Sequence, residues 1–119
     1  MLNKNQILSA NDLTTKTVSV PEWGGEVMIR ELTGRQRDIL EGLFASRINP
    51  KTGAVLSTKD LRAKMVIMSV IGEDGEYIFA DKDTEDVSGK SARALDRIVD
   101  AVQAMNGLNE TDVEEKAGN

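Results

Sequence analysis

The 119-residue chain contains no histidine and no cysteine. Without histidine it lacks the side chain that most often transfers protons near neutral pH. Without cysteine it can form neither a disulfide nor a thiolate metal site. Paired carboxylates could still act as acid and base, but only where an apolar pocket raised the pKa of one, and the carboxylates here fall in polar stretches. We therefore expect no enzyme activity, no cofactor and no bound metal.

One short stretch matches part of a nucleotide-binding motif and fails on spacing. Residues 88–91, Ser-Gly-Lys-Ser, match the end of a phosphate-binding loop. Thr84 stands where that loop needs its first glycine, and the segment before it is acidic. The stretch is more typical of a helix start, with Ser88 or Ser91 as the capping residue.

Long apolar runs and aromatic residues are also scarce. The longest apolar stretch, 65–71, is interrupted by Ser69 and is far shorter than the ~20 residues that cross a bilayer. The first residues have no apolar segment typical of a secretory signal. With one Trp, one Tyr and two Phe, the core must consist mainly of aliphatic residues and Met, which favours helix packing. We expect a cytoplasmic protein that does not enter a membrane.

The net charge of −5 is unevenly distributed. Residues 26–64 carry eight basic and five acidic side chains, whereas residues 65–86 carry one basic and seven acidic side chains. An acidic chain repels a phosphate backbone, so we expect no binding to nucleic acid. The two zones of opposite sign have two interpretations: scattered solvated charge, or two faces that associate head to tail.

The N-terminal part has the pattern of a β-hairpin. Residues 1–15 are polar with isolated apolar positions and predict an arm or a short helix. Residues 16–20 alternate polar and apolar side chains, as a half-buried strand does, and 26–31 form a second such stretch. Between them, 21–25 supply a proline, a tryptophan and two glycines, which are typical of a turn. The pattern predicts a hairpin.

Two helices carry clear boundary signals. Thr33 and Gln36 have the spacing of a capping box and predict a helix over 34–47. A second helix is predicted over 91–106 and should end at Gly107. The apolar residues of this last helix recur at helical spacing and predict its buried stripe: Leu95, Ile98, Val99, Val102 and Met105.

The middle of the chain is harder to assign. Residues 58–71 predict a helix capped by Ser57 or Thr58 and apolar on nearly all sides, so it is either central in the fold or part of an interface. A buried strand over 65–71 is the competing interpretation. A short strand is predicted at 77–79, and an acidic loop with room for one helical turn follows it.

These elements predict a single α+β domain, mostly helical, with an N-terminal β-hairpin followed by about three packed helices. The globular domain should cover residues 16–108, preceded by an arm at 1–15. Residues 109–119 are polar and acidic and predict a flexible tail.

Trp23 and three arginines are candidates for contact with a partner. Trp23, the only tryptophan, either anchors the end of the hairpin in the core or is an interface residue, since Trp is enriched among residues that dominate binding energy. Arg30, Arg35 and Arg37 follow it in sequence. They are either solvated or placed to pair with an acidic neighbour.

Methionines in the apolar stripes have a similar double interpretation. Met65, Met68 and Met105 fill the core, or they form an adaptable surface for an apolar helix of another protein. We include Met65 and Met68 among the candidate partner-binding residues.

Residues 20–34, VPEWGGEVMIRELTG, resemble the N-terminal signature of the tail assembly chaperones of long-tailed bacteriophages. In that family a Trp-Gly turn leads into a strand with an arginine and then into a Leu-Thr-Gly helix start. The later order is also similar: the apolar segment 65–71, an acidic Asp-Gly turn, Tyr-Ile-Phe at 77–79, and a last helix ending in Met-Asn-Gly-Leu at 105–108. The resemblance covers residues 16–108.

The resemblance implies a chaperone that acts in the host bacterial cytoplasm and is absent from the mature virion. It implies binding and solubilising of the tape measure protein, and recruitment of tail tube subunits through a longer, frameshifted form. Self-association is a further hypothesis, from the charge zones and the apolar segment 58–71. Two alternatives are a small virion component, such as a head–tail connector or minor tail protein, and an adaptor that binds a host protein.

Overall fold

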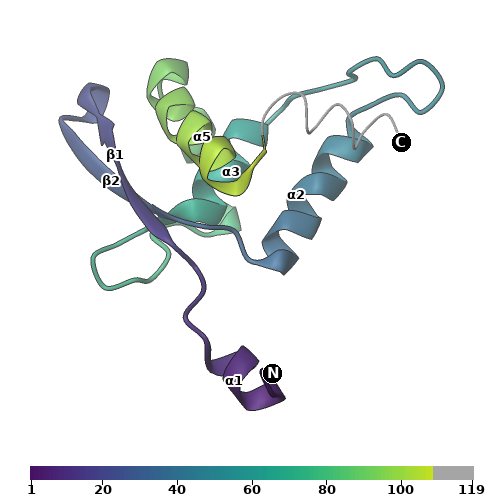
Figure 1. Cartoon of the computed structure of the whole chain (residues 1–119). Helices are drawn as coiled ribbons and strands as arrows, with labels where there is room; N and C mark the ends of the chain where they lie inside the picture. Colours follow the sequence, from purple (N-terminus) through teal and green to yellow (C-terminus); the bar gives the residue numbers. More distant parts are fainter. Residues whose placement is uncertain (109–119) are drawn as a thin grey trace.

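The computed structural model describes residues 1–108, so the predicted tail at 109–119 lies outside the described residues. Its arrangement is α+β, with an antiparallel sheet on one side of the molecule and most of the helices beside it (Figure 1). This confirms the predicted fold class. In chain order the elements are α1 (Lys4–Ser9), β1 (Thr15–Val20), the 3-10 turn η1 (Pro21–Trp23), β2 (Gly25–Arg30), α2 (Gly34–Ser46), α3 (Leu61–Ser69), β3 (Val70–Ile71), the 3-10 turn η2 (Asp81–Asp83), α4 (Thr84–Ser88) and α5 (Ala92–Asn106).

The pairing of β1 with β2 confirms the hairpin that was predicted from the alternating side chains. The strands pair antiparallel, with Val20 opposite Gly25 at the turn. Gly24 has a φ of 72°, a left-handed conformation that a side chain disfavours, so a glycine suits this turn. Val18, Val20 and Ile29 point inward and are buried.

The segment 58–71 is a helix that becomes a strand. Helix α3 begins at Leu61 rather than at 58, after Asp60 in a left-handed conformation with φ 63°. No side chain caps it, so the predicted caps Ser57 and Thr58 are wrong. The helix ends at Ser69, and the chain enters β3 directly.

Strand β3 extends the sheet to the order β1-β2-β3, because Val70 pairs with Ile29 and Ile71 with Met28. The predicted strand at 77–79 is wrong: only an isolated bridge joins Tyr77 to Ile71. The acidic segment that follows forms η2 and α4.

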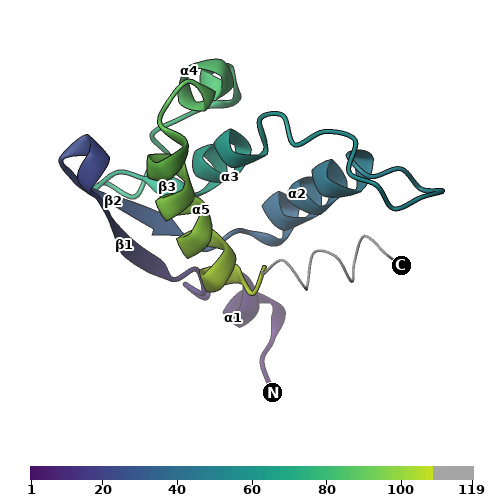
Figure 2. The same cartoon turned by 90° about the horizontal axis from the view of Figure 1, so that it is seen from above.

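Helix α3 is the centre of the fold. It lies between α2 and α5 and also contacts α4 (Figure 2). Its residues Ala63, Met65 and Val66 are buried with the inner face of the hairpin and the stripe of α5. Helix α3 was predicted to be either central in the fold or part of an interface, because it is apolar on nearly all sides. The structure supports the first alternative, a central position.

The ends of α2 and α5 follow the predicted signals. Thr33 and Gln36 form a complete capping box at the start of α2. Ser91 caps α5, and Gly107, with φ 67°, ends it. The stripe of α5 is buried as predicted for Leu95, Ile98, Val99 and Val102, whereas Met105 is half-buried.

Candidate partner-binding site

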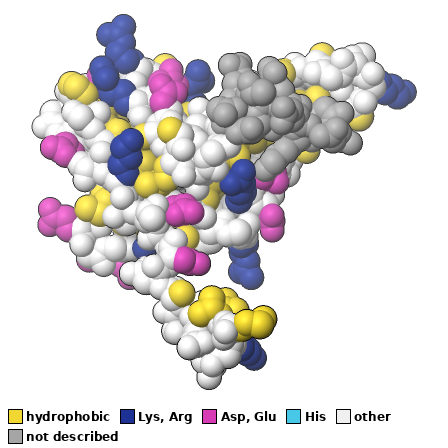
Figure 3. All heavy atoms as spheres, in the orientation of Figure 1, with side chains coloured by type: hydrophobic (Ala, Val, Ile, Leu, Met, Phe, Trp, Pro, Cys, Tyr) yellow, Lys and Arg dark blue, Asp and Glu magenta, His cyan; other side chains and the backbone are white. Residues whose placement is uncertain are grey.

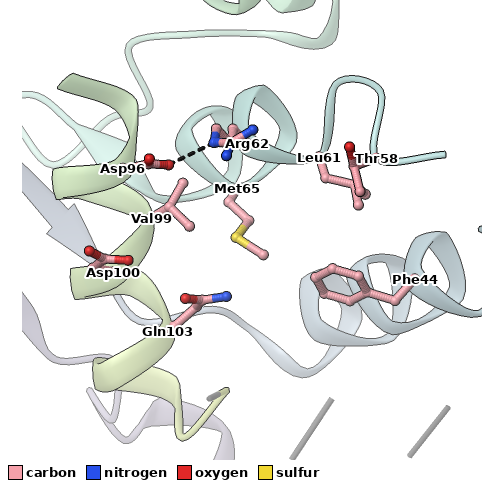
Figure 4. Close-up of a pocket in the computed structure, with 9 residues that line it drawn as sticks. All are labelled: Phe44, Thr58, Leu61, Arg62, Met65, Asp96, Val99, Asp100 and Gln103. Carbon is pink, nitrogen blue, oxygen red and sulfur yellow. Dashed lines mark hydrogen bonds and ion pairs between the residues drawn. The ribbon is translucent and has the colours of Figure 1, made fainter. Parts of the chain in front are cut away.

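A groove of about 470 Å³ opens between α2, α3 and α5 (Figure 4). We call it the Met65 groove. Its apolar floor combines side chains from three helices: Phe44, Leu61, Met65 and Val99. Its polar rim consists of Thr58, Arg62, Asp96, Asp100 and Gln103.

The floor of the Met65 groove is built by helix packing. Met65 comes from the central helix α3, and its side chain extends between α5 and the Phe44 ring of α2 (Figure 4). Phe44 is half-buried against the core, so one side of its ring faces the groove. At one end Arg62 and Asp96 form an ion pair, with Nε and Oδ1 2.6 Å apart. The groove can therefore accept apolar side chains while its rim stays hydrated.

A second groove, of about 340 Å³, lies at the hairpin tip beside α4. We call it the Trp23 groove. Trp23, Phe79 and Val87 supply its apolar lining, and Asp83, Asp86 and Lys90 supply charged groups. The Trp23 side chain stays 40% exposed, so it is neither a buried core anchor nor fully solvated. That Trp23 contacts a partner stays a prediction, and the Trp23 groove is the surface where that contact would form.

Two of the three candidate arginines hold parts of the chain together. Arg30 donates from Nη1 to the carbonyl oxygen of Gly75 at 3.0 Å, and its guanidinium carbon lies 4.7 Å from the centre of the Tyr77 ring. Arg37 donates from Nη1 to the carbonyl oxygen of Asn106 at 2.9 Å. Arg37 thereby joins the first turn of α2 to the end of α5.

Arg37 also pairs with Glu41 one turn along α2, at 3.1 Å. Arg35 differs from the other two arginines, because it is exposed at the start of α2. Arg35 is therefore the arginine of the three best placed to meet a partner.

Both candidate methionines pack in or against the core, and Met65, at 3% exposure, is the more buried of the two. Met65 lies in the floor of the Met65 groove. Met68 packs half-buried against the core, and its carbonyl oxygen accepts a hydrogen bond from Gln36 at 3.2 Å. Met68 lines neither groove. The charge zones are also partly joined within the chain, because Lys64 pairs with Asp81 at 3.3 Å.

Several groove residues had no signal of their own in the sequence. In the sequence, Phe44 and Val99 look like ordinary members of helical stripes. Phe79 and Val87 look like parts of a short strand and of an acidic loop. They become candidate binding residues only because the fold brings separate elements together. The one available signal was the apolar character of helix α3, which pointed to Met65.

No helix in the described residues, 1–108, is long and apolar enough to cross a membrane. Over the same range, no group of three or more acidic residues is arranged to hold a metal ion.

Comparison with known proteins identifies the family of this chain. Residues 3–119 match the sequence profile of a family described as phage tail assembly chaperone. A solved structure, that of the bacteriophage HK97 tail assembly chaperone, aligns with a TM-score of 0.60 at 20% identity, over 85% of this chain and 90% of that chain. At this identity the alignment shows a shared fold. Comparison with curated protein sequences gave no match. Because the matched profile covers nearly the whole chain, the protein belongs to the phage tail assembly chaperones, a family of non-enzymatic assembly proteins that act on tail proteins.

Proposed function

We propose that this chaperone binds the tape measure protein of its phage and keeps it soluble until the tail tube forms around it. The binding takes place in the cytoplasm of the infected bacterium, and the chaperone is absent from the finished virion. The observation that carries the proposal is the Met65 groove, a hollow of about 470 Å³ between three helices, where Phe44 is half-buried and Leu61, Met65 and Val99 form the floor beneath it.

The chemistry of the groove suits an amphipathic helix. Such a helix places apolar side chains at spacings of three and four residues, which enter an apolar groove while its polar face stays in water. The thioether of Met65 is polarizable and unbranched, so it adapts to side chains of different shape. The exposed polar rim leaves the partner's charged residues solvated. The groove therefore suits many different helical segments rather than one.

A tape measure protein is long, helical and partly apolar, and it would aggregate if its apolar surface were left exposed. Many chaperone copies, each holding one segment weakly, would cover such a chain through multivalency. Weak individual contacts also let tail tube subunits displace the chaperone copy by copy.

Co-expression tests this proposal. We expect the phage's tape measure protein to stay soluble with the wild-type chain and to precipitate with Phe44→Ser, which removes one side of the groove floor. Ile39→Ser is the matched control: Ile39 lies on the same helix, is half-exposed and does not line the groove. Circular dichroism would verify that both variants fold.

Asp100→Arg is a second groove variant, chosen because Asp100 is exposed on the rim and its replacement leaves the core unchanged. We expect it to alter the affinity for the tape measure protein without changing stability. If both groove variants solubilise the tape measure protein as well as Ile39→Ser, the Met65 groove is not the binding surface.

We also propose that a longer, frameshifted form of the chain recruits tail tube subunits. Support comes from the family to which the chain belongs. The gene should contain a slippery heptamer near the codons for residues 108–119, and mass spectrometry of infected cells should detect the longer product. Tail tube protein should co-purify with the longer form and not with the 119-residue chain. Detection of either form in purified virions would favour a structural component instead.

A further inference from the structure

We propose that Gly42 is a hinge within helix α2, so that the last turn of this helix, which carries Phe44, opens and closes the Met65 groove. The movement is a property of the free chain, and its part in binding rests on the proposed function of the groove. Three observations carry the proposal: a glycine that no contact requires, firm attachment of the helix before that glycine, and loose attachment after it.

Gly42 lies in the interior of α2 with open space beside its Cα atom. A Cβ atom added there would meet nothing within 4 Å outside the helix backbone around it. The φ of Gly42 is not in the left-handed range that favours glycine. Glycine in a helix interior is less stable than alanine, because its backbone loses more entropy on folding. Neither packing nor conformation therefore accounts for this glycine, and what it supplies is a point at which the helix can bend.

The part of α2 before Gly42 is firmly attached to the rest of the fold. Nε2 of Gln36 donates to the carbonyl oxygen of Met68 at 3.2 Å, at the end of α3. Arg37 donates to the carbonyl oxygen of Asn106 at 2.9 Å, at the end of α5. Leu40, one turn further along, is fully buried in the core. These contacts hold the first two turns of the helix in place.

The part of α2 after Gly42 is attached more loosely. Of the thirteen residues of α2, all of which the structure describes, Leu40 is the one that is buried, whereas six of the nine residues of α3 are buried. Phe44 is half-buried, and Ala45 and Ser46 are exposed. The loop 47–60 is mostly exposed and extends away from the other elements (Figure 1), so it can follow a movement of the last turn. Segments with few buried apolar contacts open at low cost in free energy.

Arg47 holds the last turn of α2 near the start of α3. Its Nη1 atom donates to the carbonyl oxygen of Lys59 at 2.7 Å, two residues before α3 begins. This hydrogen bond is exposed, so water can replace it at small net cost. Arg47 is thus a positioning residue: it keeps Phe44 at the groove without touching a partner itself.

A movement of the last turn changes the width of the Met65 groove. The ring of Phe44 lies across the groove from the α5 side chains Val99 and Gln103 (Figure 4). Bending at Gly42 carries this ring away from α5 and admits larger apolar side chains, and closure brings the ring back against them. One groove can then hold helical segments of different bulk.

Distances between spin labels in the free, full-length chain test the movement. Because the chain contains no cysteine, labels attach only where cysteines are introduced. Ala45→Cys with Ala104→Cys spans from the last turn of α2 to α5, and Asp38→Cys with Ala104→Cys spans from the attached part of α2; all three positions are exposed. We expect a broader distance distribution for the first pair. Gly42→Ala should narrow it to the width of the second pair, and Arg47→Ala should broaden it.

Two matched controls separate the hinge from general effects on the helix and the loop. Ser46→Ala raises the helix propensity of the same last turn but keeps the glycine, so the distribution should stay broad. Lys51→Ala removes an exposed basic side chain from the loop and should behave like the wild type. Equal widths for the two label pairs, or a distribution that Gly42→Ala leaves broad, would overturn the proposal.

Binding to the tape measure protein tests what the hinge does. Gly42→Ala should raise the melting temperature and yet bind up to about fivefold more weakly, because alanine favours the straight, closed helix by about that ratio. If Gly42→Ala binds like the wild type while Phe44→Ser does not bind, the groove is the binding surface and the hinge proposal is wrong. If Phe44→Ser also binds normally, the proposed function fails, and the label distances alone confirm or refute the hinge.

Discussion

Glu22, at the tip of the hairpin, and Arg97, on α5, form a two-pronged ion pair although they lie 75 residues apart in the sequence. Nε of Arg97 donates to Oε1 at 2.7 Å, and Nη2 donates to Oε2 at 3.0 Å. The hydrogen-bonded guanidinium lowers the pKa of the Glu22 carboxyl below its ordinary value, and the carboxylate raises the pKa of Arg97. The pair fixes the turn that carries Trp23 to the last helix.

The pKa of Glu22 predicts a pH-dependent stability. Because the folded state lowers this pKa, the pair stabilises the protein above the ordinary glutamate pKa, and the contribution is lost as the pH falls through the folded-state value. We expect Glu22→Gln to lower the urea midpoint at neutral pH and to have no effect in strong acid. Glu26→Gln, on the next strand, is the control. Equal effects of Glu22→Gln at both pH values would contradict the assignment.

Capping predicts a loss of stability for one threonine variant and almost none for another. Thr33→Ala removes a complete capping box at the start of α2 and should cost about 1 kcal/mol of unfolding free energy. Thr58→Ala lies three residues before α3, where no side-chain cap exists, and should change stability by less than about 0.5 kcal/mol. Denaturant unfolding of both variants checks this. A large effect of Thr58→Ala would show that α3 is capped in solution.

The core and the arm should respond differently to loss of an isoleucine side chain. Ile98 is fully buried in the stripe of α5, and Ile98→Ala should cost about 2–5 kcal/mol. Ile7, on α1, is exposed, and Ile7→Ala should leave the stability of a dilute sample within about 0.5 kcal/mol of wild type. Thermal unfolding of the two variants measures the difference. A comparable loss for Ile7→Ala would place the arm in the folded core.

The neighbouring residues Arg35 and Arg37 should differ in how much each contributes to stability. Arg37→Ala removes the hydrogen bond to the carbonyl oxygen of Asn106 and should destabilise the protein by roughly 1 kcal/mol. Arg35→Ala should leave stability unchanged, because Arg35 is exposed. Unfolding curves test both expectations, and binding to the tape measure protein shows whether Arg35 contacts the partner. If Arg35→Ala were the more destabilising, the assignment of these roles would be wrong.

Local sequence signals predicted the elements whose boundaries depend on neighbouring residues. The hairpin followed from alternation around a Pro-Glu-Trp-Gly-Gly turn, and α2 and α5 followed from caps and apolar spacing. The change from α3 to β3 did not follow from such signals, because Val70 and Ile71 continue the apolar run of the helix. They become a strand only because the edge of β2 lies beside them and offers Met28 and Ile29 as pairing partners.

The candidate site was less predictable for a related reason. The partners of Arg30 and Arg37 lie 45 and 69 residues away, so no local pattern indicated that these arginines stabilise the fold. Phe44 and Val99 meet around Met65 only after three helices have packed. Trp23 was the exception, since a large aromatic residue in a turn indicates a contact of some kind wherever the rest of the chain lies.

The direct passage from α3 into β3 has a consequence for how this gene can vary in length. One residue inserted between Ser69 and Val70 would turn the strand over, exchanging the faces of Val70 and Ile71 and placing both out of step with the helix before them. The stretch between α2 and α3 is mostly exposed, and its bridge between Ile48 and Val55 joins residues of the stretch itself. Insertions and deletions among relatives should therefore gather in residues 47–60 and be absent at the junction of 69 and 70, which a comparison of homologous genes would reveal.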